Sequence, residues 1–179
     1  MHIIPNVLTI LRLLMVPLIV LLIIERQMTG AFYLFVIAGL TDGLDGFLAK
    51  RFDWSSELGA WLDPAADKAL LVSIYVTLGL FGHIPVWLVI LVVSRDLLIV
   101  GGILLSMMME NPVRMKPLLV SKINTVGQIL LAAAVLADLG FLLGLGKIVT
   151  LMIVLVAVST IVSTLAYLYA WFKHMVPHQ

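Results

Sequence analysis

Apolar residues fall in six long stretches, separated by short turns that contain polar residues, glycine or proline. An α-helix rises 1.5 Å per residue, so roughly 20 apolar residues are needed to cross a hydrocarbon core of about 30 Å. Each stretch is close to that length. We therefore predict six membrane-spanning helices, over residues 7–24, 28–48, 58–82, 84–109, 118–139 and 147–172.

The composition excludes an ordinary soluble domain. Hydrophobic residues fill 63% of the 179 positions and charged residues only 12%. A soluble fold of this composition would leave most of its surface apolar. The sequence shows no internal repeat or second domain, and the first stretch lacks the flanks of a removable signal peptide. We expect an all-α integral membrane protein, a six-transmembrane-helix bundle in which residues 1–179 form a single domain.

The distribution of charge predicts the orientation of this bundle. With the N-terminus inside, the inner loops carry most of the cations. They hold Lys50, Arg51, Arg114, Lys116, Lys122 and Lys173, whereas the outer turns hold Arg26 and Lys147. By the positive-inside rule, both termini and the polar turn after residue 51 face the cytoplasm.

Four aspartates, Asp42, Asp45, Asp63 and Asp67, interrupt the second and third stretches. A carboxylate costs roughly 2.5–3.5 kcal/mol at the centre of a membrane helix, so the four need a compensating cation. Their spacings put each pair on one face of a helix, and the short turn over 52–57 makes the two helices neighbours. We predict a cup of carboxylates that suits Mg²⁺, Mn²⁺ or Ca²⁺. Since the chain has no cysteine, a thiolate site is excluded.

Small and basic residues surround these aspartates. Gly46 and Gly59 have no side chain and Ala49 has a small one, which allows a flat ligand to approach closely. Lys50 and Arg51 add positive charge. Carboxylates for a metal, small residues for a base and cations for phosphate together suggest a nucleotide diphosphate site.

The aspartates also have an interpretation as partners of buried cations. Lys68, Arg12 or Arg95 would then pair with them inside an ion or proton transporter, the non-enzyme alternative. Lys68 follows Asp67 directly, and its side chain therefore points away from the helix face that carries Asp67. Arg12 lies one turn inside the first helix, so we expect its guanidinium to snorkel to the inner headgroups.

The window from Asp42 to Asp67 resembles the signature of the CDP-alcohol phosphatidyltransferases, D-x2-D-G-x2-A-R-x8-G-x3-D-x3-D. The resemblance implies a six-helix membrane enzyme that transfers a phosphatidyl or similar group from a CDP-linked donor to an alcohol and releases CMP. It also implies one or two divalent ions, Mg²⁺ or Mn²⁺. The metal ligands would be Asp42, Asp45, Asp63 and Asp67, with Asp67 also the general base.

The same resemblance implies a set of CDP-binding residues: Asn6, Asp42, Gly46, Ala49, Lys50 and Gly59. Lys50 stands where the family has arginine, and it keeps the charge but loses the bidentate fork. Asn6 has the structural alternative of capping the first helix.

Residues outside the signature resemble the eukaryotic-type cardiolipin synthases of this family, among them Ser94–Arg95–Asp96 and the run from Ser121 to Thr125. That resemblance implies CDP-diacylglycerol as donor and phosphatidylglycerol as acceptor, a homodimer, and no nucleic-acid partner. The acceptor-binding residues would be Arg95, Lys122, Arg114 and Lys116. We expect the chain in a bacterial inner membrane, with its active site facing the cytoplasm.

Phosphatidylglycerophosphate synthase, which uses glycerol 3-phosphate, is the closest alternative. Such enzymes tend to carry a second arginine about two turns after the Arg95 position, where this chain has Gly101, Gly102 and two apolar residues. A soluble dianion requires more cations than a phosphodiester lipid does, so we favour phosphatidylglycerol. Arg95 has an ion pair with Asp96 as its structural alternative, and Lys122 has snorkelling.

Overall fold

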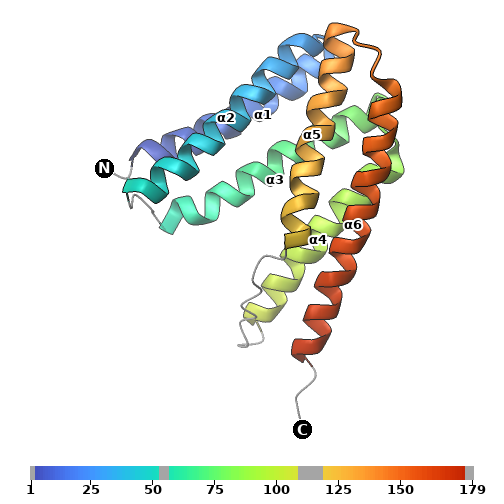
Figure 1. The fold of residues 1–179 in the computed structure, drawn as a ribbon. Helices are drawn as coiled ribbons and strands as arrows, with labels where there is room; N and C mark the ends of the chain where they lie inside the picture. The colour runs from blue at the N-terminus through green and yellow to red at the C-terminus, as the bar shows by residue number, and fades with distance from the viewer. Residues whose placement is uncertain (1–2, 53–56, 109–118, 176–179) are drawn as a thin grey trace. The chain divides into compact units, whose positions relative to one another are not determined.

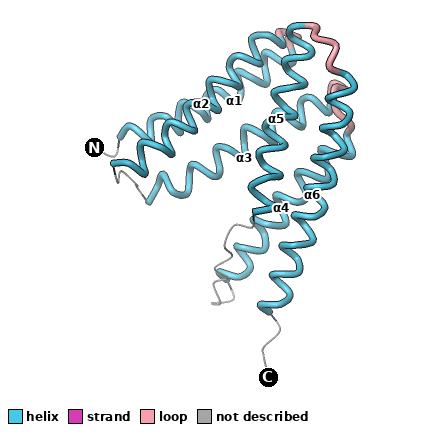
Figure 2. The backbone as a smooth tube through the Cα atoms, viewed as in Figure 1, coloured by secondary structure: helices cyan, strands magenta, loops and turns pink. Residues whose placement is uncertain are grey.

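The computed structural model describes the backbone of residues 3–52, 57–108 and 119–175, and the side chains of residues 9–43, 66–102 and 119–171. Every regular element in these ranges is a helix, which agrees with the predicted all-α class (Figures 1 and 2). The helices begin and end within a few residues of the predicted stretches. They are α1 (Ile3–Ile24), α2 (Met28–Phe52), α3 (Glu57–Leu80), α4 (Val86–Met108), α5 (Leu119–Phe141) and α6 (Gly146–Met175).

Two helical segments in the described part of the chain are long and apolar enough to cross a membrane. They are Leu119–Phe141 and Gly146–Trp171, while the apolar segments Thr9–Ile24 and Met28–Gly43 are shorter. The number of spans predicted from the sequence, six, is thus supported only in part.

Contacts within the chain divide it into two compact units. Unit 1 comprises Met1–His83 with Ala132–Gly146, and it contains α1, α2, α3 and the end of α5. Unit 2 comprises Ile84–Leu131 with Lys147–Gln179, and it contains α4, the start of α5 and α6. The expectation of a single domain stays a prediction.

In unit 1, α1 packs against both α2 and α3. The buried side chains recur every three or four residues, as the 3.6-residue period of a helix requires. Fully buried examples are Ile19 and Ile23 on α1, Ala31 on α2, and Ile74 and Leu78 on α3.

Helices α1 and α3 end in the same way. The amide of Gln27 donates to the carbonyl of Leu22 at 2.8 Å, and that of His83 donates to Leu78 at 2.9 Å. The residues before those donors, Arg26 and Gly82, have φ of 59° and 74°. This is the Schellman arrangement, which satisfies the last carbonyls and reverses the chain within a few residues.

The end of α5 touches the start of α2 at Gly140. A Cβ on this glycine would lie 2.8 Å from the backbone nitrogen of Thr29, so no larger residue fits without a shift. The Thr29 hydroxyl also donates a 2.8 Å hydrogen bond to the Gly140 carbonyl. Next to this contact, the ring of Phe141 meets those of Phe32 and Tyr33 edge-on.

In unit 2, polar side chains join α5 to α6. Asn124 is fully buried, and its Oδ1 accepts hydrogen bonds of 2.7 Å from Ser159 and 2.9 Å from Thr160. A Cβ added to Gly127, one turn further along α5, would lie at an ordinary contact distance of 3.5 Å from Cγ2 of Val156 on α6. The two helices thus pack together there, and the hydrogen bonds of Asn124 fix how they pair.

Candidate functional site

The buried face of α1 contains an arginine. Thr9, Arg12, Met15, Ile19 and Ile23 recur at intervals of three or four residues, and each is at most 8% exposed. Arg12 therefore lies on the face that packs against α2 and α3. The expectation that Arg12 snorkels to the headgroups is wrong, because its guanidinium has carboxylate partners inside the unit.

Those partners include two of the predicted site residues. Arg12 Nη1 lies 2.7 Å from Asp42 Oδ1 of α2 and donates a 2.6 Å hydrogen bond to Asp67 Oδ1 of α3. The Arg12 side chain is completely buried, whereas each aspartate side chain remains 43% exposed. The acidic ends of α2 and α3 meet, as the short turn between them predicts.

The chemistry of this pair fits a divalent cation. Two carboxylates from different helices converge on one cationic nitrogen, and oxygen ligands of this kind are those that Mg²⁺ and Mn²⁺ prefer. Among the described side chains, no group of three or more potential metal ligands occurs. Asp45 and Asp63, the other two predicted ligands, lie outside the described side chains.

Several other predicted residues also lie outside the described side chains. For the CDP site these are Asn6, Gly46, Ala49, Lys50 and Gly59, and for the acceptor site they are Arg114 and Lys116. Their roles stay predictions.

A second buried arginine, Arg95, lies in unit 2. Its Nη1 is 2.6 Å from Asp96 Oδ1, and its Nη2 donates a 2.9 Å hydrogen bond to Ser163 of α6 and a shorter one to Ser121 of α5. The side chains of Arg95 and Asp96 are only 2% and 8% exposed. Its guanidinium carbon also lies 5.8 Å from the centre of the Tyr167 ring, within cation–π range.

The ion pair foreseen as the structural alternative for Arg95 is therefore present. The guanidinium joins three helices, since α4 supplies Arg95 and Asp96, α5 supplies Ser121, and α6 supplies Ser163. Lys122, which follows Ser121, is exposed. The ion pair does not exclude a role in acceptor binding, because Arg95 also forms part of a cavity wall.

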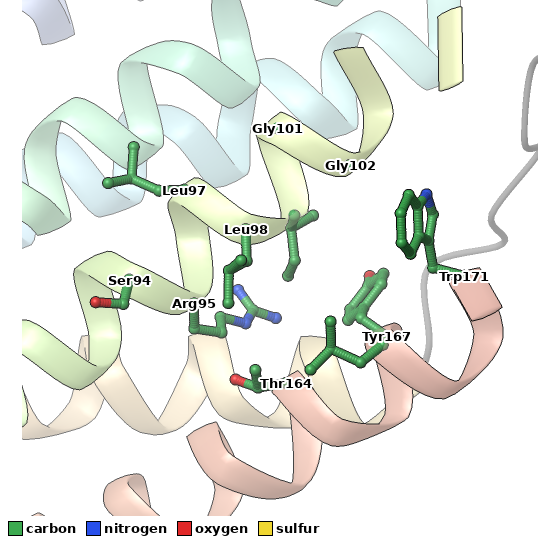
Figure 3. A pocket seen from close by; sticks show the side chains of 11 residues that line it. Ser94, Arg95, Leu97, Leu98, Gly101, Gly102, Thr164, Tyr167 and Trp171 are labelled. Carbon is green, nitrogen blue, oxygen red and sulfur yellow. The ribbon is translucent and has the colours of Figure 1, made fainter. Parts of the chain in front are cut away.

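This cavity has a volume of about 520 Å³ and lies between α4 and α6. Figure 3 shows Arg95 and Tyr167 at the cavity, with Trp171 beyond them and Gly101 and Gly102 along α4. An added Cβ at Gly101 or Gly102 would meet no atom within 4 Å. The lining is mostly apolar; the complete set is Ser94, Arg95, Leu97, Leu98, Ile99, Gly101, Gly102, Thr164, Tyr167, Leu168 and Trp171.

Comparison with known families shows to which family the chain belongs. The family model described as CDP-alcohol phosphatidyltransferase matches residues 2–175. The chain belongs to the CDP-alcohol phosphatidyltransferase family. The resemblance seen in the signature is thereby confirmed, and α1 to α6 all fall within the matched region.

Three curated relatives of the chain have the following similarity. Cardiolipin synthase (CMP-forming) of Homo sapiens is 37% identical over 150 residues, covering 75% of this chain and 50% of the relative. Probable cardiolipin synthase (CMP-forming) of Drosophila melanogaster is 36% identical over 138 residues, covering 68% and 43%. The chloroplastic CDP-diacylglycerol–glycerol-3-phosphate 3-phosphatidyltransferase 1 of Oryza sativa is 34% identical over 183 residues, covering 91% and 55%.

These comparisons confirm the resemblance to cardiolipin synthases. The chain spans about half the length of the curated relatives it matches. Together with the two long apolar helices in the described residues, membership of the CDP-alcohol phosphatidyltransferase family indicates a membrane protein.

Sequence reasoning placed Asp42, Asp67 and Arg95 among the site residues, and it named the pairing of the aspartates with Arg12 and of Arg95 with Asp96 as structural alternatives, both of which are present. It missed the serine partners of Arg95. The signal for Arg12 was its position on the buried stripe of α1, which the apolar pattern of that helix contains. No comparable signal pointed to Ser163, which is 68 positions from Arg95 and looks like an ordinary polar residue in an apolar helix.

Proposed function

We propose that this chain transfers the phosphatidyl group of CDP-diacylglycerol to phosphatidylglycerol, releasing CMP and forming cardiolipin. The observation that carries the proposal is the meeting of Asp42 and Asp67 at one buried cation, in a chain that belongs to the CDP-alcohol phosphatidyltransferase family. The relatives named as cardiolipin synthases support this choice of product.

The proposed reaction is a single displacement at phosphorus. A glycerol hydroxyl of the acceptor forms a bond to the phosphatidyl phosphorus, the bond from that phosphorus to the bridging oxygen breaks, and CMP leaves. Asp67 takes the hydroxyl proton as general base. Its side chain is 43% exposed, so an acceptor can reach it, and Arg12 fixes one carboxylate oxygen from the buried side.

In this proposal Asp42, Asp45, Asp63 and Asp67 hold the divalent metal, Mg²⁺ or Mn²⁺. When bound, it would stabilise the charge that grows on the diphosphate oxygens. The nucleotide would lie against Gly46, Ala49 and Gly59, with Asn6 and Lys50 at its phosphates. Carboxylates that converge on a cation support the metal part of the proposal.

The α4–α6 cavity supports a lipid acceptor. A volume of about 520 Å³ with a mostly apolar lining suits an acyl chain, and ligand pockets commonly have volumes of roughly 300–1,000 Å³. Gly101 and Gly102 widen the cavity where a second arginine would favour a soluble phosphate monoester. We propose that one acyl chain of phosphatidylglycerol occupies this cavity, while Arg95, Lys122, Arg114 and Lys116 supply the positive charge for its phosphate.

The remaining parts of the proposal concern the membrane. We propose that all six helices span a bacterial inner membrane, that the aspartates face the cytoplasm and that the protein is a homodimer. The excess of cations on the predicted inner loops supports the orientation. The dimer rests on the family resemblance alone.

One experiment separates the acceptors. Purified protein receives CDP-diacylglycerol and Mg²⁺ with either phosphatidylglycerol or glycerol 3-phosphate, and CMP and the lipid product are measured. We expect cardiolipin from phosphatidylglycerol. If phosphatidylglycerophosphate forms instead, the reaction matches the one stated in the name of the Oryza sativa relative. That result would overturn the acceptor assignment alone.

The transporter alternative is tested in the same preparation. Protein reconstituted into liposomes is assayed for ion or proton flux with and without CDP-diacylglycerol. Flux in the absence of any CMP release would overturn the enzymatic proposal.

A further inference from the structure

We propose that Arg12 is an internal counter-cation that holds Asp42 and Asp67 together, so that the acidic site is assembled before any metal binds. The inference deepens the proposed function and rests on it for the identity of the site. It assigns to Arg12 a positioning role, since its described contacts are with carboxylates of the site.

The geometry separates Arg12 from an incidental ion pair. One nitrogen, Nη1, carries two N–H groups, and it lies within 2.7 Å of a carboxylate oxygen from each of two helices. A single cation therefore joins α2 to α3 from a third helix, α1. A salt bridge that served only to neutralise the arginine would need one aspartate.

The contact with Arg12 compensates the negative charge of the two carboxylates. Two carboxylates that face each other between two helices repel each other. The repulsion either separates the helices or forces one of the carboxylates to take up a proton. A guanidinium does not lose its proton in proteins, so it supplies permanent positive charge. Arg12 thus performs, in the absence of metal, the charge compensation that a bound metal would otherwise provide.

The difference in burial shows from which side Arg12 approaches the two carboxylates. Arg12 is completely buried and the two aspartate side chains are each 43% exposed. The arginine therefore approaches the carboxylates from inside the unit and leaves part of each accessible from outside. A divalent ion can bind there without requiring that Arg12 first move away.

The first test compares thermal unfolding of Arg12→Gln in chelator and in saturating Mg²⁺. Loss of a buried partner is strongly destabilising, and we expect the midpoint to fall by roughly 5 °C or more in chelator. Mg²⁺ should recover a large part of this loss, because it then compensates the same two carboxylates. Arg26→Gln is the matched control, since it removes an arginine that is exposed in the same unit.

The second test is metal-free and measures coupling. Arg12→Gln is introduced into wild type and into a protein with both Asp42→Asn and Asp67→Asn, and unfolding midpoints are compared in chelator. If Arg12 compensates the two charges, its loss should cost markedly less in the double-asparagine background. Arg12→Lys, which keeps the charge, should lose less than Arg12→Gln in the wild-type background.

An equal loss in both backgrounds would overturn the inference, because it assigns Arg12 to packing alone. An equal loss with and without Mg²⁺, together with coupling in chelator, would refute metal binding at this pair and leave the role of Arg12 supported. Failure of the proposed function looks different. A wild-type protein that releases no CMP would refute the enzymatic assignment, while the coupling measured in chelator would still decide the role of Arg12.

Discussion

Each of the two units buries an arginine beside aspartate, Arg12 in unit 1 and Arg95 in unit 2, but the surroundings of these two arginines differ. Arg12 contacts aspartates of two other helices, and both keep 43% of their side chains exposed. Arg95 contacts the aspartate next to it on its own helix, and that side chain is only 8% exposed. Arg12 thus pairs with carboxylates that a ligand can reach, whereas the carboxylate that pairs with Arg95 is buried.

The exposure of the paired carboxylates distinguishes a ligand-binding site from a structural ion pair. A buried pair that satisfies itself, as Arg95 and Asp96 do with two serines, fixes the arrangement of helices. A buried cation with half-exposed carboxylates leaves part of each carboxylate accessible to a ligand. We call Arg12, Asp42 and Asp67 the Arg12 cluster, and Arg95, Asp96, Ser121 and Ser163 the Arg95 cluster. Loss of an exposed carboxylate in the Arg12 cluster should mainly reduce activity, whereas loss of the buried carboxylate in the Arg95 cluster should mainly reduce stability.

The largest expected effect is on activity, at the exposed side of the Arg12 cluster. Asp67→Asn removes the proposed general base, and such groups contribute roughly 10²–10⁴-fold to rate. We expect CMP release to fall by a factor in that range, while the helical circular dichroism spectrum remains unchanged. Near-normal CMP release by this variant would refute the general-base role of Asp67.

The next effect is on stability, in the Arg95 cluster. Asp96→Ala leaves a buried guanidinium without its carboxylate, which costs on the order of 3 kcal/mol in comparable cases. We expect a large fall in the unfolding midpoint, and Mg²⁺ should not restore it. Ser163→Ala is the control within the cluster, because it removes a neutral partner and should cost about 1 kcal/mol. Recovery by Mg²⁺ would contradict the contrast between the clusters.

A smaller effect is expected in the cavity beside Arg95. Gly101→Leu fills space that an added side chain can enter without a close backbone contact. We predict a several-fold rise in KM for phosphatidylglycerol with long acyl chains, and a weaker rise for a short-chain analogue. The KM for CDP-diacylglycerol should stay the same.

The control for this measurement is Gly101→Ala, which adds only one carbon and should behave as wild type. A rise in both KM values, or one that is independent of acyl length, would show that no acyl chain of the acceptor occupies the cavity.

The smallest expected effect concerns Arg26, whose charge acts on the imidazole of His83. Burial, and then the charge of Arg26, lower the pKa of His83 below its ordinary 6.5. The folded state thus favours neutral His83. The stabilisation is fully present above pH 6.5 and is lost as the pH falls below that value towards the folded-state pKa.

The measurement is the unfolding midpoint at pH 7.5 and 5.5 for wild type and for His83→Gln. We expect the wild type to lose slightly more stability at low pH than the variant does. An equal pH dependence of the two proteins would show that His83 does not contribute.

Much of the fold could be predicted because its signals are local. Helix bounds follow from the lengths of apolar stretches, and they came within a few residues in all six described helices. The meeting of Asp42 and Asp67 was also predictable, since a short turn forces α2 and α3 to be neighbours. The family followed from the spacing of the signature, which is again a property of one short window.

The choice between the alternatives for each arginine could not be made in the same way. Arg12 and Asp67 are 55 positions apart, and Arg95 and Ser163 are 68 apart. Snorkelling and burial are both possible for an arginine near a helix end, and the choice depends on whether carboxylates of other helices lie within reach. The contact of Gly140 with Thr29 is equally long-range.

The sequence by itself determined the family and the helices of the described part of the chain, because these depend on periodicity and on spacing along the chain. Only the tertiary structure decided that Arg12 lies behind two exposed carboxylates, that Arg95 is enclosed with Asp96, and that Gly101 and Gly102 open onto a cavity. Those outcomes depend on which faces of distant helices meet, and side-chain packing between helices sets that.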